Sequence, residues 1–491
     1  MGKIPANIIQ LFLADFSPAF LTYGFLVVSS NYTGLDIIGI VGVLISTSLI
    51  FSSLSNFEIG VGSKRYLGKY ASENNWLAFK QTTFATTLFV SVTSLLTILI
   101  LLNPWFNFTT IFGIEQKFFL IISIMIFGAN IQHVLRGVLT SYLRSKVVLV
   151  STLLGSVSRF PLLAVYFYSN ELNDLTVSWS YSIFYVTASL ILVIFVSYWL
   201  NKIKGSPITD CIKNIKIIFR ASVVRWIPML IGVLGSRLGI LAVFSNGTSS
   251  DAGTYFIPYA LFGILMLIST STTQIIHPVF SGISDKKSQE DLLKKIVKVS
   301  FLISAPIASI MIFYSRSILE IFGKDFGLGE EIFVILLASF PLIIISESVY
   351  FLFYARGEYK NIFYLGLCGN IPRIILYFIL VPLEGGIGAA IAFSVGSVFQ
   401  MIPTMFLIKQ KKIHLQYLQI VKITIIPIML GLSLFIIQID TIGSLIIFFI
   451  SYVIFFKLRI ITEKDINELF SEKNTKNKDT ILKVLKQLKL L

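Results

Sequence analysis

The sequence predicts an all-α polytopic membrane protein of about 14 transmembrane helices, in two pseudo-symmetric six-helix lobes followed by two C-terminal helices. Three observations lead to this prediction. The 491 residues are 55% hydrophobic and 13% charged, with a mean hydropathy of +0.84, whereas a soluble domain carries roughly a quarter charged residues. Apolar segments of membrane-spanning length recur along the whole chain. Several polar positions also recur in the same order in both halves.

Each predicted span holds about 20 mostly apolar residues, the length that a helix needs to cross the hydrocarbon core. Backbone groups in hydrocarbon must be paired within their own segment, so these segments are predicted as helices. The first is interpreted as a span and not as a removable signal peptide, because apolar spans continue along the chain. In order, the spans cover 7–29, 34–57, 78–102, 117–139, 147–168, 177–200, 222–244, 254–280, 296–315, 331–354, 361–382, 386–408, 418–437 and 441–460.

The net charge of +15 follows the predicted topology. Most of the 40 Lys and Arg residues fall in alternate loops and in the tail, which is the bias that places those loops in the cytoplasm. We therefore expect a multi-pass protein of the cytoplasmic membrane with both termini in the cytoplasm. Membrane lipids are then its surroundings, and the basic charge requires no nucleic acid as a partner.

An internal repeat divides the predicted spans into an N-lobe (1–203, spans 1–6) and a C-lobe (221–412, spans 7–12). Gly155 and Arg159 in the fifth span correspond to Gly369 and Arg373 in the eleventh. Six spans in each lobe imply parallel topology, with the lobes related by an axis along the membrane normal. Further pairs in the same order are Lys146 with Lys360, His133 with Glu347, and Pro18 with Pro228.

Three segments lie outside the two lobes. Residues 204–220 alternate isoleucine with lysine and arginine, which predicts an interfacial linker helix. Residues 413–461 form spans 13 and 14. Residues 462–491 are predicted as a cytoplasmic basic tail with an amphipathic helix on the anionic inner leaflet, with a frayed tail as the alternative.

Ionisable residues within spans are costly and are therefore candidate functional residues. The candidates of each sign are Arg159, Arg373, Arg237 and Arg225 against Asp15, Glu347 and, near an inner helix end, Glu58. One interpretation is internal ion pairing that fixes helix packing, for example Asp15 with Arg225 between the lobes. The arginines outnumber the carboxylates, however, which favours a cationic cavity that accepts an anion. Arginine suits phosphate because its planar fork bonds two oxygens.

Other candidates concern movement and coupling. Pro18 and Pro228 each remove a helical hydrogen bond, so they are candidate hinges in the first helix of each lobe. His133 is a candidate for proton coupling, because its repeat partner Glu347 is also ionisable. The sequence has no metal-ligand cluster, no phosphate-loop spacing and no nucleophile elbow. We expect no cofactor and no enzymatic activity, and a coupling ion (Na⁺ or H⁺) as the only other ligand.

Several motifs resemble one family. VPLEGGIGAAIAFSVG (381–396) is similar to the signature that joins spans eleven and twelve in polysaccharide flippases of the multidrug/oligosaccharidyl-lipid/polysaccharide exporter superfamily. The ordered set of similar segments also includes GVGSKRYLGKYASENN after span two, LRGVLTSYLRSK after span four, IIHPVFS in span eight, IFGKDFGLGEEIFVIL before span ten and YARGEYKNIF after it. The resemblance covers nearly the whole chain.

This resemblance implies a flippase for lipid-linked oligosaccharides, of the type that transfers O-antigen repeats. In such proteins two lobes alternate between inward-open and outward-open states, and the sugar-(pyro)phosphate headgroup crosses a cationic cavity. Arg159, Arg373, Arg237 and Arg225 would then neutralise the phosphate, and Asp15, Glu347, His133 and Glu58 would supply ion coupling or cavity charge. Candidate partners are a glycan polymerase or glycosyltransferases.

Three alternatives stay open. A cation-coupled multidrug exporter would need acidic residues facing its cargo, and the four arginines argue against it. A flippase for the peptidoglycan lipid precursor has an equally anionic cargo. A membrane glycosyltransferase or polymerase would ordinarily show catalytic carboxylates or long outer loops. An enzyme would change the mass of the glycan, whereas a flippase changes only its side of the membrane.

Overall fold

The computed structural model describes residues 3–103, 113–209, 211–282, 285–437 and 442–462. It describes their side chains except those of 3–9, 268–282, 442 and 444. Regular secondary structure in these residues is helical. In chain order the elements are α1 (Lys3–Asn56), α2 (Ile59–Ser72), α3 (Trp76–Leu102), η2 (Gln116–Phe118), α5 (Phe119–Ser141), α6 (Ser145–Val157), α7 (Arg159–Tyr168), α8 (Asp174–Asn201), α9 (Cys211–Asn246), α10 (Ser249–Gly282), α11 (Lys286–Phe313), α12 (Ser315–Glu320), η3 (Lys324–Gly329), α13 (Glu330–Ala338), α14 (Phe340–Ala355), α15 (Tyr359–Gln410), α16 (Tyr417–Ile436) and α17 (Ile442–Lys457).

The predicted spans correspond to these helices. Helix α1 carries the first two spans with a break at Gly34, and α15 carries the eleventh and twelfth with a break at Gly385. Both glycines have positive φ, 80° and 54°, a conformation that glycine adopts without steric cost. In the described residues nine helices are long and apolar enough to cross a membrane, or ten if the α13–α14 pair, bent by 42°, forms one span. The prediction of a helical membrane protein is confirmed.

The predicted linker helix is divided differently in the structure. Residues 204–209 are not helical, whereas Cys211 begins α9 and the helix continues through the seventh span to Asn246. The isoleucines and basic residues from Ile212 to Arg220 therefore form the first turns of a long helix, whereas Lys204 and Ile208 precede it. The predicted amphipathic helix of the tail lies outside the described residues, apart from Thr462 at its start.

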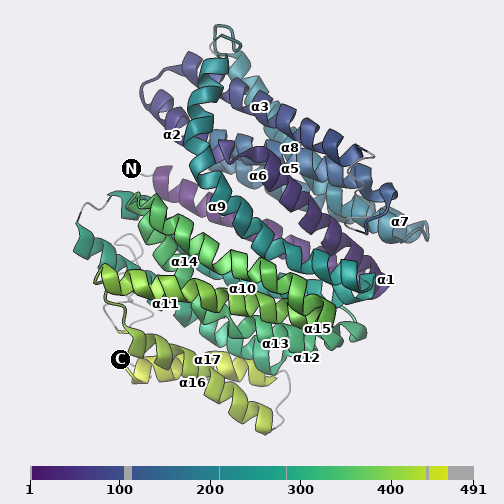
Figure 1. Cartoon of the computed structure of the whole chain (residues 1–491), viewed down its shortest axis with the longest axis vertical. Coiled ribbons are helices and arrows are strands. Elements are labelled where there is room, and N and C mark those ends of the chain that lie inside the picture. Colours follow the sequence, from purple (N-terminus) through teal and green to yellow (C-terminus); the bar gives the residue numbers. More distant parts are fainter. Residues whose placement is uncertain (1–2, 104–112, 210, 283–284, 438–441, 463–491) are drawn as a thin grey trace.

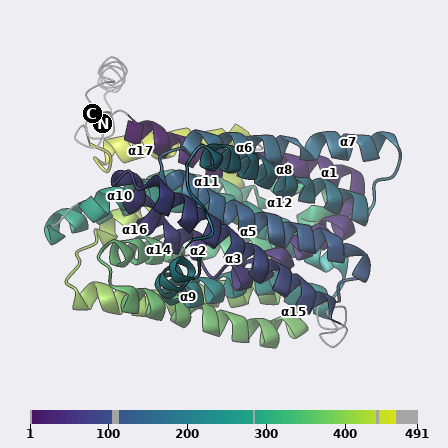
Figure 2. The same cartoon turned by 90° about the horizontal axis from the view of Figure 1, so that it is seen from above.

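Two groups of helices lie on opposite sides of a central layer (Figure 1). Helices α2, α3, α5, α6 and α8 form one group, and α11, α13, α14 and α15 belong to the other, with α16 and α17 at its far edge. Between them α1 packs against α10 and α9, and α9 packs along α15. The view from above shows the long helices running side by side in roughly one direction (Figure 2). Helices α1, α9 and α10 therefore carry the contacts between the two lobes.

The repeat positions of the two lobes make similar contacts. A Cβ on Gly155 would meet Phe184 and Ala188 of the following span, and a Cβ on Gly369 would meet Gln400 of the span that follows it. Small residues at such positions let transmembrane helices approach closely. The glycine of the repeat is thus explained by packing of span five on six and of span eleven on twelve.

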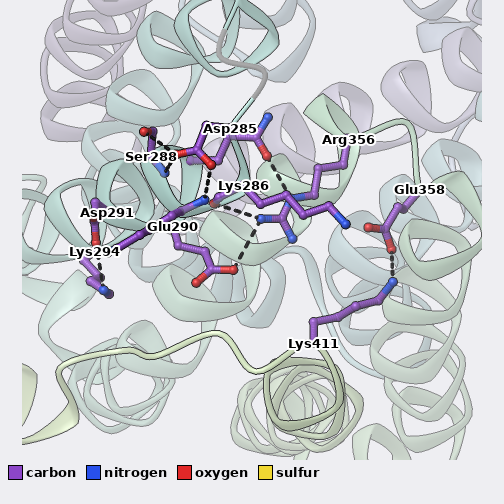
Figure 3. A network of polar contacts seen from close by, with 11 residues as sticks. Asp285, Lys286, Ser288, Glu290, Asp291, Lys294, Arg356, Glu358 and Lys411 are labelled. Atoms are coloured by element: carbon purple, nitrogen blue, oxygen red, sulfur yellow. Dashed lines mark hydrogen bonds and ion pairs between the residues drawn. The ribbon is translucent and has the colours of Figure 1, made fainter.

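A polar network joins three segments of the C-lobe (Figure 3). Arg356, after α14, donates from Nε to Gln289 Oε1 of α11 (2.9 Å) and lies 3.6 Å from the Glu290 carboxylate. Lys411, after α15, pairs with Glu358 at 2.7 Å. The network ties the start of α11 to both ends of α15. These contacts hold the basic loops of this lobe together.

Candidate functional site: an aromatic and cationic cavity between the lobes

A cavity of about 310 Å³ lies between the two lobes. Its walls come from α1 and α8 on one side and from α9, α10 and α15 on the other. Arg237 is the charged residue among its lining side chains, and no Asp or Glu of the described residues lines it. The aromatic lining residues are Tyr23, Tyr181, Tyr185, Phe256, Tyr259, Phe262 and Phe393. The cavity is therefore aromatic and carries net positive charge.

Arg237 reaches the cavity from the middle of α9, which also holds the predicted hinge Pro228. Its guanidinium lies 5.5 Å from the ring centre of Tyr259 on α10, within the range of a cation–π contact. Beside it, the Tyr23 hydroxyl of α1 donates to the carbonyl of Ala260 on α10 at 2.6 Å. This bond joins the two lobes across the cavity. Arg237 supplies the positive charge of the cavity lining.

Arg159 stands directly behind one wall of the cavity. It begins α7 after a break in the span at Ser158, and only 2% of its surface is exposed. Nη1 donates to the hydroxyl of Thr22 (2.6 Å), and the guanidinium lies 4.1 Å from the ring centre of Tyr181. Thr22 and Tyr181 both line the cavity. The charge of Arg159 is thus separated from the cavity by a single layer of side chains.

Arg373 occupies the equivalent place behind the opposite wall. It is 6% exposed, and its guanidinium lies 4.0 Å from the ring centre of Phe393, which lines the cavity. Nη1 donates to Asn370 Oδ1 (3.1 Å) and Nη2 to the Ser397 hydroxyl (3.0 Å). Like Arg159, it has a buried Nε without a hydrogen-bond partner among the described residues. The repeat therefore places one arginine behind each wall.

Neutral groups hold both of these arginines. Within the described residues, no carboxylate lies within ion-pair distance of Arg159, Arg237 or Arg373. Glu347 interacts electrostatically with Arg373 from beyond ion-pair distance. Because buried charges are normally paired directly and none of these three cations is, the site keeps a net positive potential. Such a site can stabilise an anion, because Coulomb attraction is stronger where water is scarce.

Arg225 lies apart from the cavity and belongs to a polar cluster nearer the end of the bundle. Its Nε lies 3.5 Å from Glu58 Oε2, and Nη1 donates to the Tyr354 hydroxyl. Glu58 is 4% exposed and follows Asn56, whose side-chain oxygen accepts from the Glu58 amide (2.8 Å). Because Glu58 follows α1 and Arg225 lies on α9, this pair connects the lobes.

Asp15 does not pair with Arg225, so the pairing proposed for these two residues is wrong. The Asp15 carboxylate instead accepts from Arg136 Nη2 of α5, in its own lobe. Helix α1 packs against α5 at this point. Glu58 therefore takes the role at the lobe interface that the sequence suggested for Asp15.

The two candidates for proton coupling lie in different surroundings. His133 Nε2 is 4.0 Å from Glu58 Oε1 and thus belongs to the same cluster as Arg225. Glu347 on α14 is half-buried, and no described residue forms an ion pair or hydrogen bond with its side chain. Neither residue lines the cavity. The described residues contain no group of three His, Cys, Asp or Glu side chains that could hold a metal ion.

The predicted hinges lie inside continuous helices, Pro18 in α1 and Pro228 in α9. The carbonyl of Pro18 accepts from the Thr22 hydroxyl (2.7 Å), and the same hydroxyl accepts from Arg159. On the other side, Pro228 lies near Gly366 of α15. Pro18 is therefore connected to Arg159 through Thr22, and Pro228 to Arg373 through Gly366 and Asn370. A role of either proline in bending stays a prediction.

A second set of contacts joins the lobes near the break at Gly34, in the middle of α1. The Ser249 hydroxyl of α10 donates to Asp36 Oδ1 (3.0 Å), and the Asn31 side chain donates to the carbonyl of Ile321 (2.8 Å). Gly39 approaches so closely that a Cβ there would collide with the backbone of Ser249 and Gly253. Contacts between the lobes thus lie on both sides of the cavity along α1.

Several functional side chains carry no signal in the sequence. The cavity tyrosines on α1, α8 and α10 are spaced like any aromatic residue of a membrane span, and only packing brings them together. Arg136, which pairs with Asp15, was not among the candidate residues. Trp226, which donates to the carbonyl of Ser53 across the lobes (2.9 Å), was also missed. Its indole next to Arg225 was the one available hint, since buried tryptophans need a hydrogen-bond partner.

No family model and no curated relative matches the sequence. Solved structures do match. The lipid II flippase MurJ in an inward closed conformation superposes with a TM-score of 0.72 at 16% identity, covering 92% of this chain and 100% of that one. This chain therefore has the same fold as the lipid II flippase MurJ. A multidrug resistance MATE family transporter of the MOP superfamily, in an inward-facing conformation, gives 0.66 at 14% identity, covering 82% of this chain and 98% of that one.

Proposed function

We propose that this protein moves a polyprenyl-(pyro)phosphate-linked oligosaccharide from the inner to the outer leaflet of the cytoplasmic membrane, by alternating access of its two lobes. The observation that carries the proposal is the cavity between the lobes, with Arg237 in its wall, Arg159 and Arg373 behind it, and no lining carboxylate. A phosphate or pyrophosphate at this place would meet the charge that the described residues leave uncompensated.

The aromatic lining supports the same cargo. Tyrosine rings offer an apolar face and a polar hydroxyl, and four tyrosines line the cavity, namely Tyr23, Tyr181, Tyr185 and Tyr259. A headgroup that joins sugars to a phosphate needs both kinds of contact. The volume of about 310 Å³ lies at the small end of ligand sites, which measure roughly 300–1,000 Å³. We infer that the cavity holds the phosphate and the first sugar, and that the lobes separate to pass the remainder.

A flippase for the peptidoglycan lipid precursor is the second candidate. It is favoured by the superposition on the lipid II flippase MurJ, which covers more of this chain than the MATE transporter does. Both candidates carry an anionic lipid, so the cationic cavity serves either. A multidrug exporter for cationic compounds fits less well, because no described carboxylate lines the cavity.

Ion coupling belongs to the proposal as well. Glu58, His133 and Arg225 form one cluster at the lobe interface, and Glu347 interacts electrostatically with Arg373 without forming an ion pair. We propose that Na⁺ or H⁺ acts at one of these carboxylates and drives the change between states. No resident cofactor is part of the proposal, and a polymerase or glycosyltransferase would act beside the protein on the transferred glycan.

The test is transfer of a fluorescent polyprenyl-linked oligosaccharide in proteoliposomes, with wild type compared to Arg237→Ala, Arg159→Ala and Arg373→Ala. Losing a charge-assisted contact costs about 1.5–3 kcal/mol, so we expect transfer to fall by about tenfold or more for Arg237→Ala. Arg316→Ala is the control, because Arg316 is exposed and pairs with Glu320 outside the cavity. Transfer at the wild-type rate by Arg237→Ala would show that the charge of this cavity is not needed for transport.

Two further readouts separate the candidate functions. The mass of the glycan should stay unchanged, since a change would indicate an enzyme. Transfer of lipid II with no transfer of other glycans would favour the second candidate. Export of a cationic dye under an ion gradient, without lipid transfer, would establish the drug exporter instead.

A further inference from the structure

A second cavity, of about 340 Å³, lies in the N-lobe, next to the segment that joins the lobes. Helices α3 and α8 both pack on α5, and the space between them is the cavity. Leu135 of α5 lies at its base, and Pro207, in the segment that joins the lobes, closes one end. This cavity shares no lining residue with the one between the lobes.

The chemistry of the lining changes along the groove. Lys80 lies at the end near the linker, together with Asn201 of α8. Apolar side chains such as Phe84 and Val193 line the rest, and no Asp or Glu of the described residues lines it. Thr83 also lines the groove, and its buried hydroxyl has no hydrogen-bond partner among the described residues. One end thus suits an anion and the remainder suits hydrocarbon.

Lys80 is held in place and still has donors to offer. Its Nζ donates one hydrogen bond to the carbonyl of Ile203 (2.8 Å), and an ammonium group carries three donors. No carboxylate of the described residues forms an ion pair with it. The exposed Lys202 and Lys204 lie in the same segment as Ile203. The positive charge at this end therefore lacks an anionic partner within the described protein.

The position of the groove relative to the bilayer decides what can enter it. Lys80, Lys202 and Lys204 lie at the end of the N-lobe that the distribution of basic residues assigns to the cytoplasm. On both flanks, exposed apolar side chains continue along the helices, with Leu88 on α3 and Ile194 on α8. A molecule in the groove would place its head at the level of the anionic inner leaflet and its tail along this surface.

We propose that this groove binds an anionic phospholipid of the inner leaflet, with the phosphate on Lys80 and an acyl chain between α3 and α8. The lipid also contacts the segment that joins the lobes, because Pro207 lines the groove and Ile203 accepts from Lys80. Gln81 donates to the carbonyl of Ser206 (3.4 Å) and ties the same segment to α3. Bound lipid therefore stabilises the start of the connection to α9. The proposal does not depend on the cargo of the other cavity.

The experiment uses the full-length protein in nanodiscs of phosphatidylcholine with increasing phosphatidylglycerol, and counts retained lipids by native mass spectrometry. We expect phosphatidylglycerol to be retained over phosphatidylcholine by the wild type. One basic residue near the surface contributes about 1 kcal/mol of attraction to an anionic lipid, so Lys80→Gln should bind it about fivefold more weakly. Lys80→Arg keeps the charge and should bind as the wild type does.

Two further variants make the outcome decisive. Lys69→Gln removes an exposed lysine of the same lobe, paired with Glu73 outside the groove, and should leave binding unchanged. Val193→Trp fills the groove without altering charge and should reduce binding as Lys80→Gln does. Equal retention of both lipids by the wild type, or unchanged retention by Lys80→Gln, would overturn the proposal. Displacement of the lipid by millimolar inorganic phosphate would also overturn it, because the site would then recognise a free anion.

Discussion

Two arginines in equivalent spans of this protein are stabilised without a carboxylate of the described residues. Arg159 lies over the rings of Tyr181 and Phe184 and donates to the Thr22 hydroxyl. Arg373 lies over the ring of Phe393 and donates to Asn370 and Ser397. A guanidinium tolerates such surroundings better than an ammonium, because it is weakly hydrated and stacks on rings. Lysine at either position would lose the stacking, and at Arg373 it would also lose the pair of bonds to Asn370 and Ser397. The aromatic and neutral surroundings of these two positions therefore favour arginine over lysine.

Glu58 has the opposite character, since its charge is matched. Its side chain is close to both Arg225 and His133, and the backbone of Phe57 and Glu58 is left-handed, with φ of 49° and 55°. Non-glycine residues rarely adopt this conformation. The turn between α1 and α2 therefore aims the carboxylate at α9 at some conformational cost.

Replacing Glu58 by glutamine should destabilise the protein by about 1–3 kcal/mol, because Arg225 loses its counter-charge in a partly buried place. The measurement is unfolding in detergent followed by tryptophan fluorescence. Glu58→Gln combined with Arg225→Gln should recover part of the loss, since no unpaired charge then remains. Equal loss in the single and double variants would show that the two side chains are not coupled.

Among the helices, α1 and α10 cross most closely. Gly39 and Gly253 have no side chains at this crossing, and a Cβ on Gly253 would collide with the carbonyl of Leu35. Packing there depends on small residues and not on a hydrophobic effect, because lipid is as apolar as leucine. The crossing lies beside the Asp36–Ser249 bond, so this helix pair carries much of the contact between the lobes here, together with the bond from Asn31 to Ile321.

A leucine at Gly39 should separate α1 from α10, at an overpacking cost of about 1–3 kcal/mol. Spin labels at Tyr32→Cys and Leu328→Cys report the change, because both side chains are exposed and lie in different lobes. The exposed Cys368 and the half-buried Cys211 must first become serine. The distance between labels should lengthen in Gly39→Leu, whereas Gly68→Leu, with open space around it, should not change it. An unchanged distance in Gly39→Leu would show that the crossing does not hold the lobes together.

For the whole molecule, the arrangement of contacts suggests how transport can be stopped. The lobes meet through α1 and α10 at one end and through Glu58, Arg225, Ser53 and Trp226 at the other. Alternating access requires that one set opens while the other closes. A covalent bond across either set should therefore block a complete cycle.

A disulfide between Asp36→Cys and Ser249→Cys should abolish transfer in the liposome assay, and reduction should restore it. The two side chains already lie within hydrogen-bond distance, 3.0 Å apart. Asp36→Cys alone is the matched control, because a single cysteine at this place cannot close the bridge to α10. Transfer that continues at the wild-type rate in the oxidised Asp36/Ser249 variant would contradict movement of the lobes at this end.

The number and order of the spans followed from the sequence, because each span must satisfy its own backbone and bury about 20 apolar residues in lipid. The repeat of Gly155 and Arg159 in Gly369 and Arg373 was visible for a related reason. A rare charge in an apolar run is a strong local signal. The break of α1 at Gly34 falls at the boundary between the first two predicted spans, whereas the continuation of the linker into α9 was not predicted.

The tertiary structure alone decided which charges are paired. Asp15 joins Arg136 and Glu58 joins Arg225, since pairing depends on helix rotation and tilt, which hydropathy does not encode. It also decided that Arg159 and Arg373 support the cavity wall while Arg237 faces the cavity. The sequence alone determined that arginines outnumber carboxylates within the spans, because charges can be counted without knowing where the helices lie. Their positions around one cavity depend on contacts between helices distant in the chain, which only the fold brings together.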